Sequence, residues 1–206
     1  MIFLKITIKS KQTKKKKIQR SLNEGKITSF ELTKNCLDKI KEKKDLNAFI
    51  TVCEESSLDK ARESDKKREK KQKLGKLEGI PLSLKDAFLT ENIKTTAASK
   101  MLQSFIPPYS SHVTSKLEGE GYILIGKTNM DEYCMGSTNS HSAFGASISP
   151  WSDHWSGAPR KLTPGGSSGG FNHSKKKKTN KTKKKIFEFR ILCCCFFWNV
   201  LWLFWN

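Results

Sequence analysis

The fold class of this 206-residue chain is decided by the stretch Gly79-Ile80-Pro81-Leu82-Ser83-Leu84-Lys85. Its apolar run from Gly79 to Leu84, with glycine and proline near its start, predicts a buried β-strand. A second apolar run, Tyr122 to Ile125, lies between two glycines and predicts another strand, and His112 to Glu118 ahead of it predicts a helix. A strand, a helix and a strand in this order are typical of an α/β sheet, so we expect an α/β fold.

Two longer helices are expected ahead of this unit. The residues Thr28-Ser29-Phe30-Glu31 form a capping box and predict a helix from Thr28 to Lys44. A single helical turn around Ile18 to Leu22 should precede it. The segment from Leu58 to Lys73 is crowded with charged residues, so we expect a solvated helix there with no function of its own.

The net charge of +19 is concentrated at the two ends of the chain. Residues 1–20 carry seven lysines and one arginine without an acid, and residues 171–206 also have a net charge of +8. Runs of lysine repel one another and offer no interleaved aromatic rings for bases, so we expect no direct DNA binding. We therefore expect a disordered basic extension at 1–17, a folded part at 18–170, and a lysine-rich, then apolar tail at 171–206 outside the fold.

Cysteine and histidine patterns indicate no metal site. The six cysteines fit neither a zinc spacing nor a disulfide framework, and the four histidines lack a paired spacing. The last sixteen residues are apolar but shorter than the about 20 that a membrane-spanning helix needs. A membrane contact is therefore not expected.

Lys85 is the first candidate for chemistry, because it stands where the predicted strand ends. The ends of parallel strands are where α/β folds place their sites. Strand alternation puts Ser83 and Lys85 on one face, whereas Asp86 should point away from the Lys85 ammonium group. Lysine normally titrates near pH ~10.4, but removal of water would lower its pKa and make the amine a usable base.

The glycine-serine stretch Pro164-Gly165-Gly166-Ser167-Ser168-Gly169-Gly170 is the second candidate. It contains a literal G-x-S-x-G, which permits a nucleophile elbow with a Ser-Asp-His triad. That triad needs an acid and then a histidine well beyond the serine, and this order is not found here. A phosphate-binding loop is disfavoured too, because Phe171 and Asn172 stand where Lys and Ser or Thr are needed.

Three motifs in order resemble the amidase signature family. They are Gly79 to Asp86, Gly126 to Ser137 and Pro164 to Gly170, and the similarity extends over about Gln19 to Gly170. The resemblance implies the N-terminal part of the amidase signature fold, a mixed, mainly parallel twisted sheet flanked by helices. Within the family, the middle motif is most similar to the A-subunit branch of the mitochondrial glutamyl-tRNA(Gln) amidotransferases.

The resemblance also implies a Ser-cisSer-Lys mechanism. Lys85 would be the base, and Ser167, after a cis peptide bond, would relay the proton of the nucleophile to it. Ser168 would support the site by hydrogen bonding, and Gly166 and Gly169 would allow the bend. The family places its nucleophilic serine in a later D-x-G-G-S segment, which does not occur in these 206 residues. We therefore expect the chain as given to be inactive, and residues 171–206 to be translated intron or frame-shifted sequence.

The same resemblance implies a set of partners. Glutamine would be the substrate, the B and C subunits of the amidotransferase the partner proteins, and Glu-tRNA(Gln) would be reached through the complex in the mitochondrial matrix. The chain itself would bind no cofactor, since ATP and Mg²⁺ would be used by one of the partners. Two alternatives stay open: an amidase for another small amide, and a short non-catalytic product that binds partners.

Overall fold

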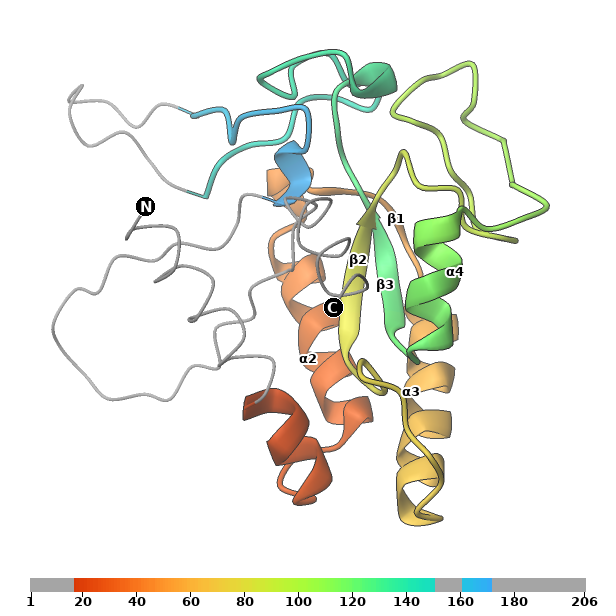
Figure 1. Cartoon of the computed structure of the whole chain (residues 1–206). Coiled ribbons are helices and arrows are strands. Elements are labelled where there is room, and N and C mark those ends of the chain that lie inside the picture. Colours follow the sequence, from red (N-terminus) through yellow and green to blue (C-terminus); the bar gives the residue numbers. More distant parts are fainter. Residues whose placement is uncertain (1–16, 151–160, 172–206) are drawn as a thin grey trace, which may run out of the picture.

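The structure, a computed structural model, describes residues 17–150 and 161–171 (Figure 1). Residues 1–16 of the expected basic extension and residues 172–206 of the expected tail lie outside the described residues. The predictions of disorder in the extension and of an unrelated tail therefore stay predictions.

A three-stranded mixed sheet forms the centre of the described fold. Strand β2 (Pro81–Lys85) pairs in parallel with β3 (Ile123–Thr128), and helix α4 (His112–Gly119) connects them. This is the strand-helix-strand unit that the sequence predicts, with β3 running further, to Thr128. Strand β1 (Phe49–Val52) was not predicted; it pairs antiparallel with the other edge of β3, so the order is β1-β3-β2. The expected α/β class and mixed sheet are confirmed.

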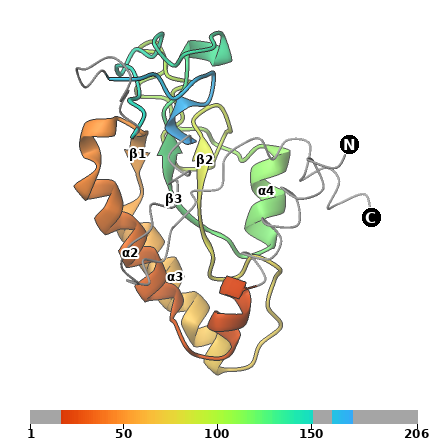
Figure 2. The ribbon, with the colours of Figure 1, turned by 90° about the vertical axis from the view of Figure 1, so that its left-hand side faces the viewer.

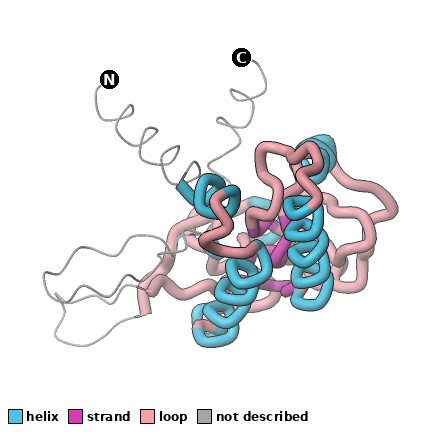
Figure 3. Tube along the Cα trace, turned by 90° about the horizontal axis from the view of Figure 1, so that it is seen from below, coloured by secondary structure: helices cyan, strands magenta, loops and turns pink. Residues whose placement is uncertain are grey.

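Helices cover both faces of this sheet. Helices α2 (Ser29–Glu42) and α3 (Glu54–Glu69) lie on one side and α4 on the other (Figure 2). Seen from below, the strands are enclosed among the helices (Figure 3). The predicted capping box begins α2: Thr28 Oγ1 accepts a hydrogen bond from the Glu31 backbone N–H at 3.1 Å, and the Glu31 carboxylate accepts one from the Thr28 N–H at 3.1 Å.

Helix α3 begins and ends four residues earlier than the sequence reading placed it. It starts directly after β1, with Glu54 and Glu55 in its first turn, where acidic side chains favour a helix N-terminus. It ends before Lys71, which has a positive φ of 51°. Its buried residues are small, and it packs against α2 with the rest of its surface charged. Among the helices that the structure describes, none is long and apolar enough to cross a membrane.

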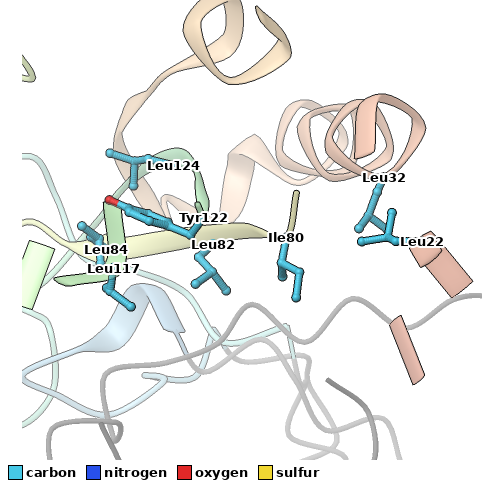
Figure 4. Packing of buried hydrophobic residues seen from close by; sticks show 8 residues of the cluster. All are labelled: Leu22, Leu32, Ile80, Leu82, Leu84, Leu117, Tyr122 and Leu124. Carbon is cyan, nitrogen blue, oxygen red and sulfur yellow. The ribbon is translucent and has the colours of Figure 1, made fainter. Parts of the chain in front are cut away.

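The apolar core joins the helices to both parallel strands (Figure 4). Its buried members are Leu22, Leu32, Ile80, Leu82, Leu84, Leu117, Tyr122 and Leu124. Full burial of one such side chain stabilises a fold by roughly 1.5–3 kcal/mol. The core thus fixes β2 and β3 side by side, and their carboxyl ends meet at one end of the sheet, where Lys85 pairs with Thr128.

Candidate active site

Lys85 and Ser167 meet at the end of strand β2. The Lys85 side chain is buried, and its Nζ donates a hydrogen bond of 2.7 Å to Ser167 Oγ, a residue 82 positions further along the chain. The peptide bond between Gly166 and Ser167 is cis, as the resemblance implied. The structure therefore brings together the two residues that the sequence proposed as base and relay.

The glycine-serine loop is held by backbone hydrogen bonds to the segment that follows β3. The Asp131 N–H donates to the Ser167 carbonyl oxygen at 3.1 Å, and the Gly170 N–H donates to the Asn129 carbonyl oxygen at 3.1 Å. Asn129 is itself fixed, since its Nδ2 donates to the carbonyl oxygens of Asn47 and Gly145, at 2.9 Å each. The glycine-serine loop thus packs directly against the segment that follows β3.

Two glycines of the loop are needed for this close approach. A methyl group at Gly166 would overlap the Asp131 carboxylate, and one at Gly169 would overlap the Asn139 side chain. Asn139 is fully buried, and neither polar atom of its side chain has a partner among the described residues. The predicted role of both glycines, to let the loop bend, is accompanied here by a packing role that the sequence did not indicate.

Ser168 is half-buried, and its side-chain hydroxyl makes no hydrogen bond to the residues that the structure describes. Its supporting role stays a prediction. Within the same described ranges, no group of three or more His, Cys, Asp and Glu side chains could hold a metal ion.

Asp131 is a buried site residue that the sequence reading missed. Its carboxylate accepts hydrogen bonds from the backbone N–H groups of Asn139, at 3.0 Å, and His141, at 3.2 Å. The His141 ring, largely exposed, has its Nδ1 3.6 Å from Asp131 Oδ1. The signal was available in the sequence: an acid lies three residues beyond the second parallel strand, at the end of the sheet where Lys85 ends the first.

Asp86 points away from Lys85, as strand alternation predicts, and is fully buried. Its Oδ2 accepts hydrogen bonds from the Thr96 backbone N–H at 2.9 Å and from Thr96 Oγ1 at 2.5 Å. In the described part of the chain, it forms no ion pair with Lys85. Burial raises the pKa of the Asp86 carboxyl, although the Thr96 hydrogen bonds and the nearby Lys127 ammonium act in the opposite direction. The contact fixes the course of the chain immediately after Lys85.

Lys127 in β3 is a second buried lysine near the site. Its Nζ donates to the Phe88 carbonyl oxygen at 2.5 Å, to Thr95 Oγ1 at 2.8 Å and to Thr90 Oγ1 at 3.2 Å. Burial lowers the pKa of Lys127 to about 8, against the attraction of Asp86. These hydrogen bonds tie the loop after β2 to the neighbouring strand, so Lys127 is a structural residue of the site.

A buried amine in contact with a hydroxyl can exchange a proton with it. A charged Lys85 side chain donates this hydrogen bond to Ser167, and a neutral amine in the same place would accept the Ser167 hydroxyl proton instead. The second oxygen lone pair of Ser167 is then available to a third group. This arrangement supports proton relay at the carboxyl ends of the parallel strands.

Sequence comparison identifies a matching family model and several relatives. The family model described as amidase matches residues 31–171. The chain is 49% identical over 137 residues to the A subunit of the mitochondrial glutamyl-tRNA(Gln) amidotransferase of Ornithorhynchus anatinus, a match that covers 66% of this chain and 26% of the relative.

Solved structures agree with this similarity. The peptide amidase of Stenotrophomonas maltophilia matches with a TM-score of 0.65 and 29% identity, covering 75% of this chain and 32% of that one. The A subunit of the glutamyl-tRNA(Gln) amidotransferase of Thermotoga maritima matches with a TM-score of 0.54 and 32% identity, covering 69% of this chain and 27% of that one. The chain thus spans about a third or less of the length of these proteins.

Proposed function

Because the chain belongs to the amidase signature family, we propose that it is part of the A subunit of a glutamyl-tRNA(Gln) amidotransferase, the component that hydrolyses glutamine. The observation that carries the proposal is the 2.7 Å hydrogen bond between Lys85 and Ser167 at the end of a parallel strand. The identity to A-subunit relatives favours glutamine as the amide.

The proposed chemistry is acyl transfer through a serine ester. A nucleophilic serine attacks the amide carbon of glutamine, and its proton passes to Ser167 Oγ while the Ser167 proton passes to a neutral Lys85 amine. Lys85 then returns the proton, through Ser167, to the departing nitrogen, which leaves as ammonia. Water attacks the ester by the same relay and releases glutamate, so the enzyme is regenerated.

The nucleophile is the group that this sequence does not contain. No D-x-G-G-S segment occurs in the 206 residues, so we propose that this polypeptide by itself hydrolyses no glutamine. We further propose that residues 171–206 lie outside the amidase domain. In the complete assembly, the B and C subunits would be the partners, ATP and Mg²⁺ would act on one of these partners, and the location would be the mitochondrial matrix.

The proposal is tested by supplying the missing segment. The residues after Gly170 are replaced by the corresponding residues of the Ornithorhynchus relative, and the product is assembled with the B and C subunits. We expect glutamine-dependent ammonia release and amidation of Glu-tRNA(Gln), both lost in Lys85→Ala and Ser167→Ala. Glutaminase activity in the 206-residue chain, abolished by Lys85→Ala, would contradict the assignment of the nucleophile. A chimera that assembles with the partners but releases no ammonia would favour a binding role without catalysis.

A second function is favoured by one observation. The peptide amidase of Stenotrophomonas maltophilia superposes with a higher TM-score, 0.65, than the 0.54 of the Thermotoga maritima amidotransferase component. An amidase for another small amide would release ammonia from simple amides or peptide amides and leave glutamine untouched. The same chimera, assayed on both kinds of amide without its partner proteins, separates the two functions.

A further inference from the structure

We propose that Asp131 is the positioning residue that holds Ser167 within hydrogen-bond reach of Lys85. The inference rests on the proposed function only in taking Lys85 and Ser167 as the reacting pair. Asp131 lies at the carboxyl end of β3, next to the strand that ends in Lys85, and its side chain is fully buried. No hydrogen bond or ion pair joins Asp131 to Lys85 among the described residues, and the hydrogen bonds that link the two residues run through Ser167.

The backbone of Asp131 fixes the serine directly. Its N–H donates to the carbonyl oxygen of Ser167 at 3.1 Å, immediately after the cis peptide bond. Because the carbonyl carbon and the side chain leave the same Cα, holding this carbonyl group restricts where Ser167 Oγ lies. A shift of Asp131 would therefore move the hydroxyl relative to Lys85 Nζ.

The side chain of Asp131 fixes its own backbone. Its two carboxylate oxygens accept hydrogen bonds from the Asn139 and His141 N–H groups, so the chain from 131 to 141 closes into a loop around the carboxylate. Hydrogen bonds from backbone N–H groups to a carboxylate are stronger than neutral ones. Loss of the carboxylate would leave two N–H groups without their acceptor and free Asp131 to move.

Two glycines leave room for this carboxylate and for nothing larger. A methyl group at Gly136 would overlap the Asp131 carboxylate group, and a methyl at Gly166 would overlap it from the side of the serine loop. The nearest neighbours of the Gly136 methyl position all belong to Asp131, whereas those of Gly166 include the backbone at 137–138. Gly136→Ala should therefore displace the Asp131 side chain without changing its identity and without a clash with the backbone at 137–138.

The test measures how fast dilute acetic anhydride acetylates Lys85 in the whole 206-residue chain, by peptide mass spectrometry as a function of pH. Ser167→Ala sets the expected change, about fivefold faster, the factor for one ordinary hydrogen bond. We expect Asp131→Ala to reproduce the acetylation rate and pH profile of Ser167→Ala. The rate in Asp131→Asn should lie between those of the original chain and Asp131→Ala. Glu132→Ala, which removes the neighbouring carboxylate, should leave Lys85 at its original rate.

Lys127 is the internal reference in every sample. Lys127 is completely buried, and its Nζ bonds to the loop after β2 instead of to the serine loop. It should therefore stay protected from acetylation in each variant unless the whole fold opens. A rise at Lys85 with Lys127 unchanged therefore reports positioning, whereas a rise at both reports unfolding and contradicts the proposal. The readout needs no enzymatic activity, so failure of the glutaminase assignment would not affect it.

A double substitution completes the test. Gly136→Ala should accelerate Lys85 acetylation in the original chain but add nothing to Asp131→Ala, because the side chain that the methyl overlaps has been removed. The proposal is overturned if Lys85 keeps its original rate and pH profile in Asp131→Ala while Ser167→Ala changes them. It is also overturned if the two substitutions act independently.

Discussion

Lys127 Nζ lies 3.9 Å from Asp86 Oδ1, and both side chains are completely shielded from solvent. This separation is too long for a hydrogen bond, so the pair is joined by charge alone. Asp86 Oδ2 and Lys127 Nζ each bond to a threonine of the loop after β2, whereas Asp86 Oδ1 has no hydrogen-bond partner among the described residues. The site therefore contains two lysines of different character: Lys85 faces the serine loop, and Lys127 faces the structural loop after β2.

Replacing Lys127 with methionine should strongly destabilise the fold. The change keeps the length of the side chain but leaves the buried Asp86 without its counter-charge, and breaking a buried pair in this way costs about 3–5 kcal/mol. Urea unfolding followed by circular dichroism measures the difference. The matched control is Lys94→Met on the exposed surface of the same loop, expected within about 0.5 kcal/mol of the original chain. Equal stabilities for the two variants would show that the buried pair contributes nothing.

The stability that depends on Lys127 should increase as pH rises above about 8. The folded-state pKa of about 8 lies below the ordinary value of 10.5, so between these values the unfolded chain binds a proton that the folded chain has released. Stability then rises with pH by at most about 1.4 kcal/mol per unit. Subtracting Lys127→Met data from the original chain isolates this slope from the buried cysteines. A difference that does not change between pH about 8 and about 9 would place the folded-state pKa of Lys127 near its ordinary value.

Gly169→Ala should release the serine loop from the segment after β3. The added methyl would overlap the Asn139 side chain, and overpacking of this kind costs about 1–3 kcal/mol. We expect the Gly170 N–H, which donates to Asn129, to lose its protection from hydrogen exchange. Gly119→Ala is the control, because a methyl there meets nothing within 4 Å and lies in helix α4. Retained protection at Gly170 in the Gly169→Ala chain would contradict the packing argument.

Thr28→Ala should cost about 1 kcal/mol, the usual value of a helix N-cap side chain. Thermal or urea unfolding gives the number. Since Thr28 and Glu31 bond to each other's backbone N–H groups, Glu31→Ala should cost less in the Thr28→Ala chain than in the original. Additive costs would mean that the two hydrogen bonds form independently.

The features that were predicted correctly from the sequence are those that depend on neighbouring residues. The capping box, the alternation of β2 and the helix before β3 are local patterns, and each reappears in the structure. Strand β1 was not predicted because it has only four residues, Phe49–Val52, and its partner β3 lies more than seventy positions away in the sequence. The start of α3 was predicted too late in the sequence, because the helix begins directly after the unpredicted strand β1.

The candidate site divides in the same way. Lys85 and Ser167 were found because strand-end position and motif resemblance both mark them. Asp131, Asn139 and Lys127 were not, because a buried polar side chain is defined by the partners that surround it, and those partners come from distant parts of the chain. The Lys85–Ser167 contact itself spans 82 residues and is set by the sheet and by Asp131 together.

The last strand of the described sheet ends at Thr128, well before Ser167. A polypeptide emerging from the ribosome can therefore bury the leucines of the described core and pair the three described strands before the glycine-serine loop is synthesised. Closing long loops is slow because chain entropy opposes it, so the contacts of this loop should be among the last to form. Lys85 would therefore reach its place at the end of β2 first, and Ser167 would join it only after the sheet has formed.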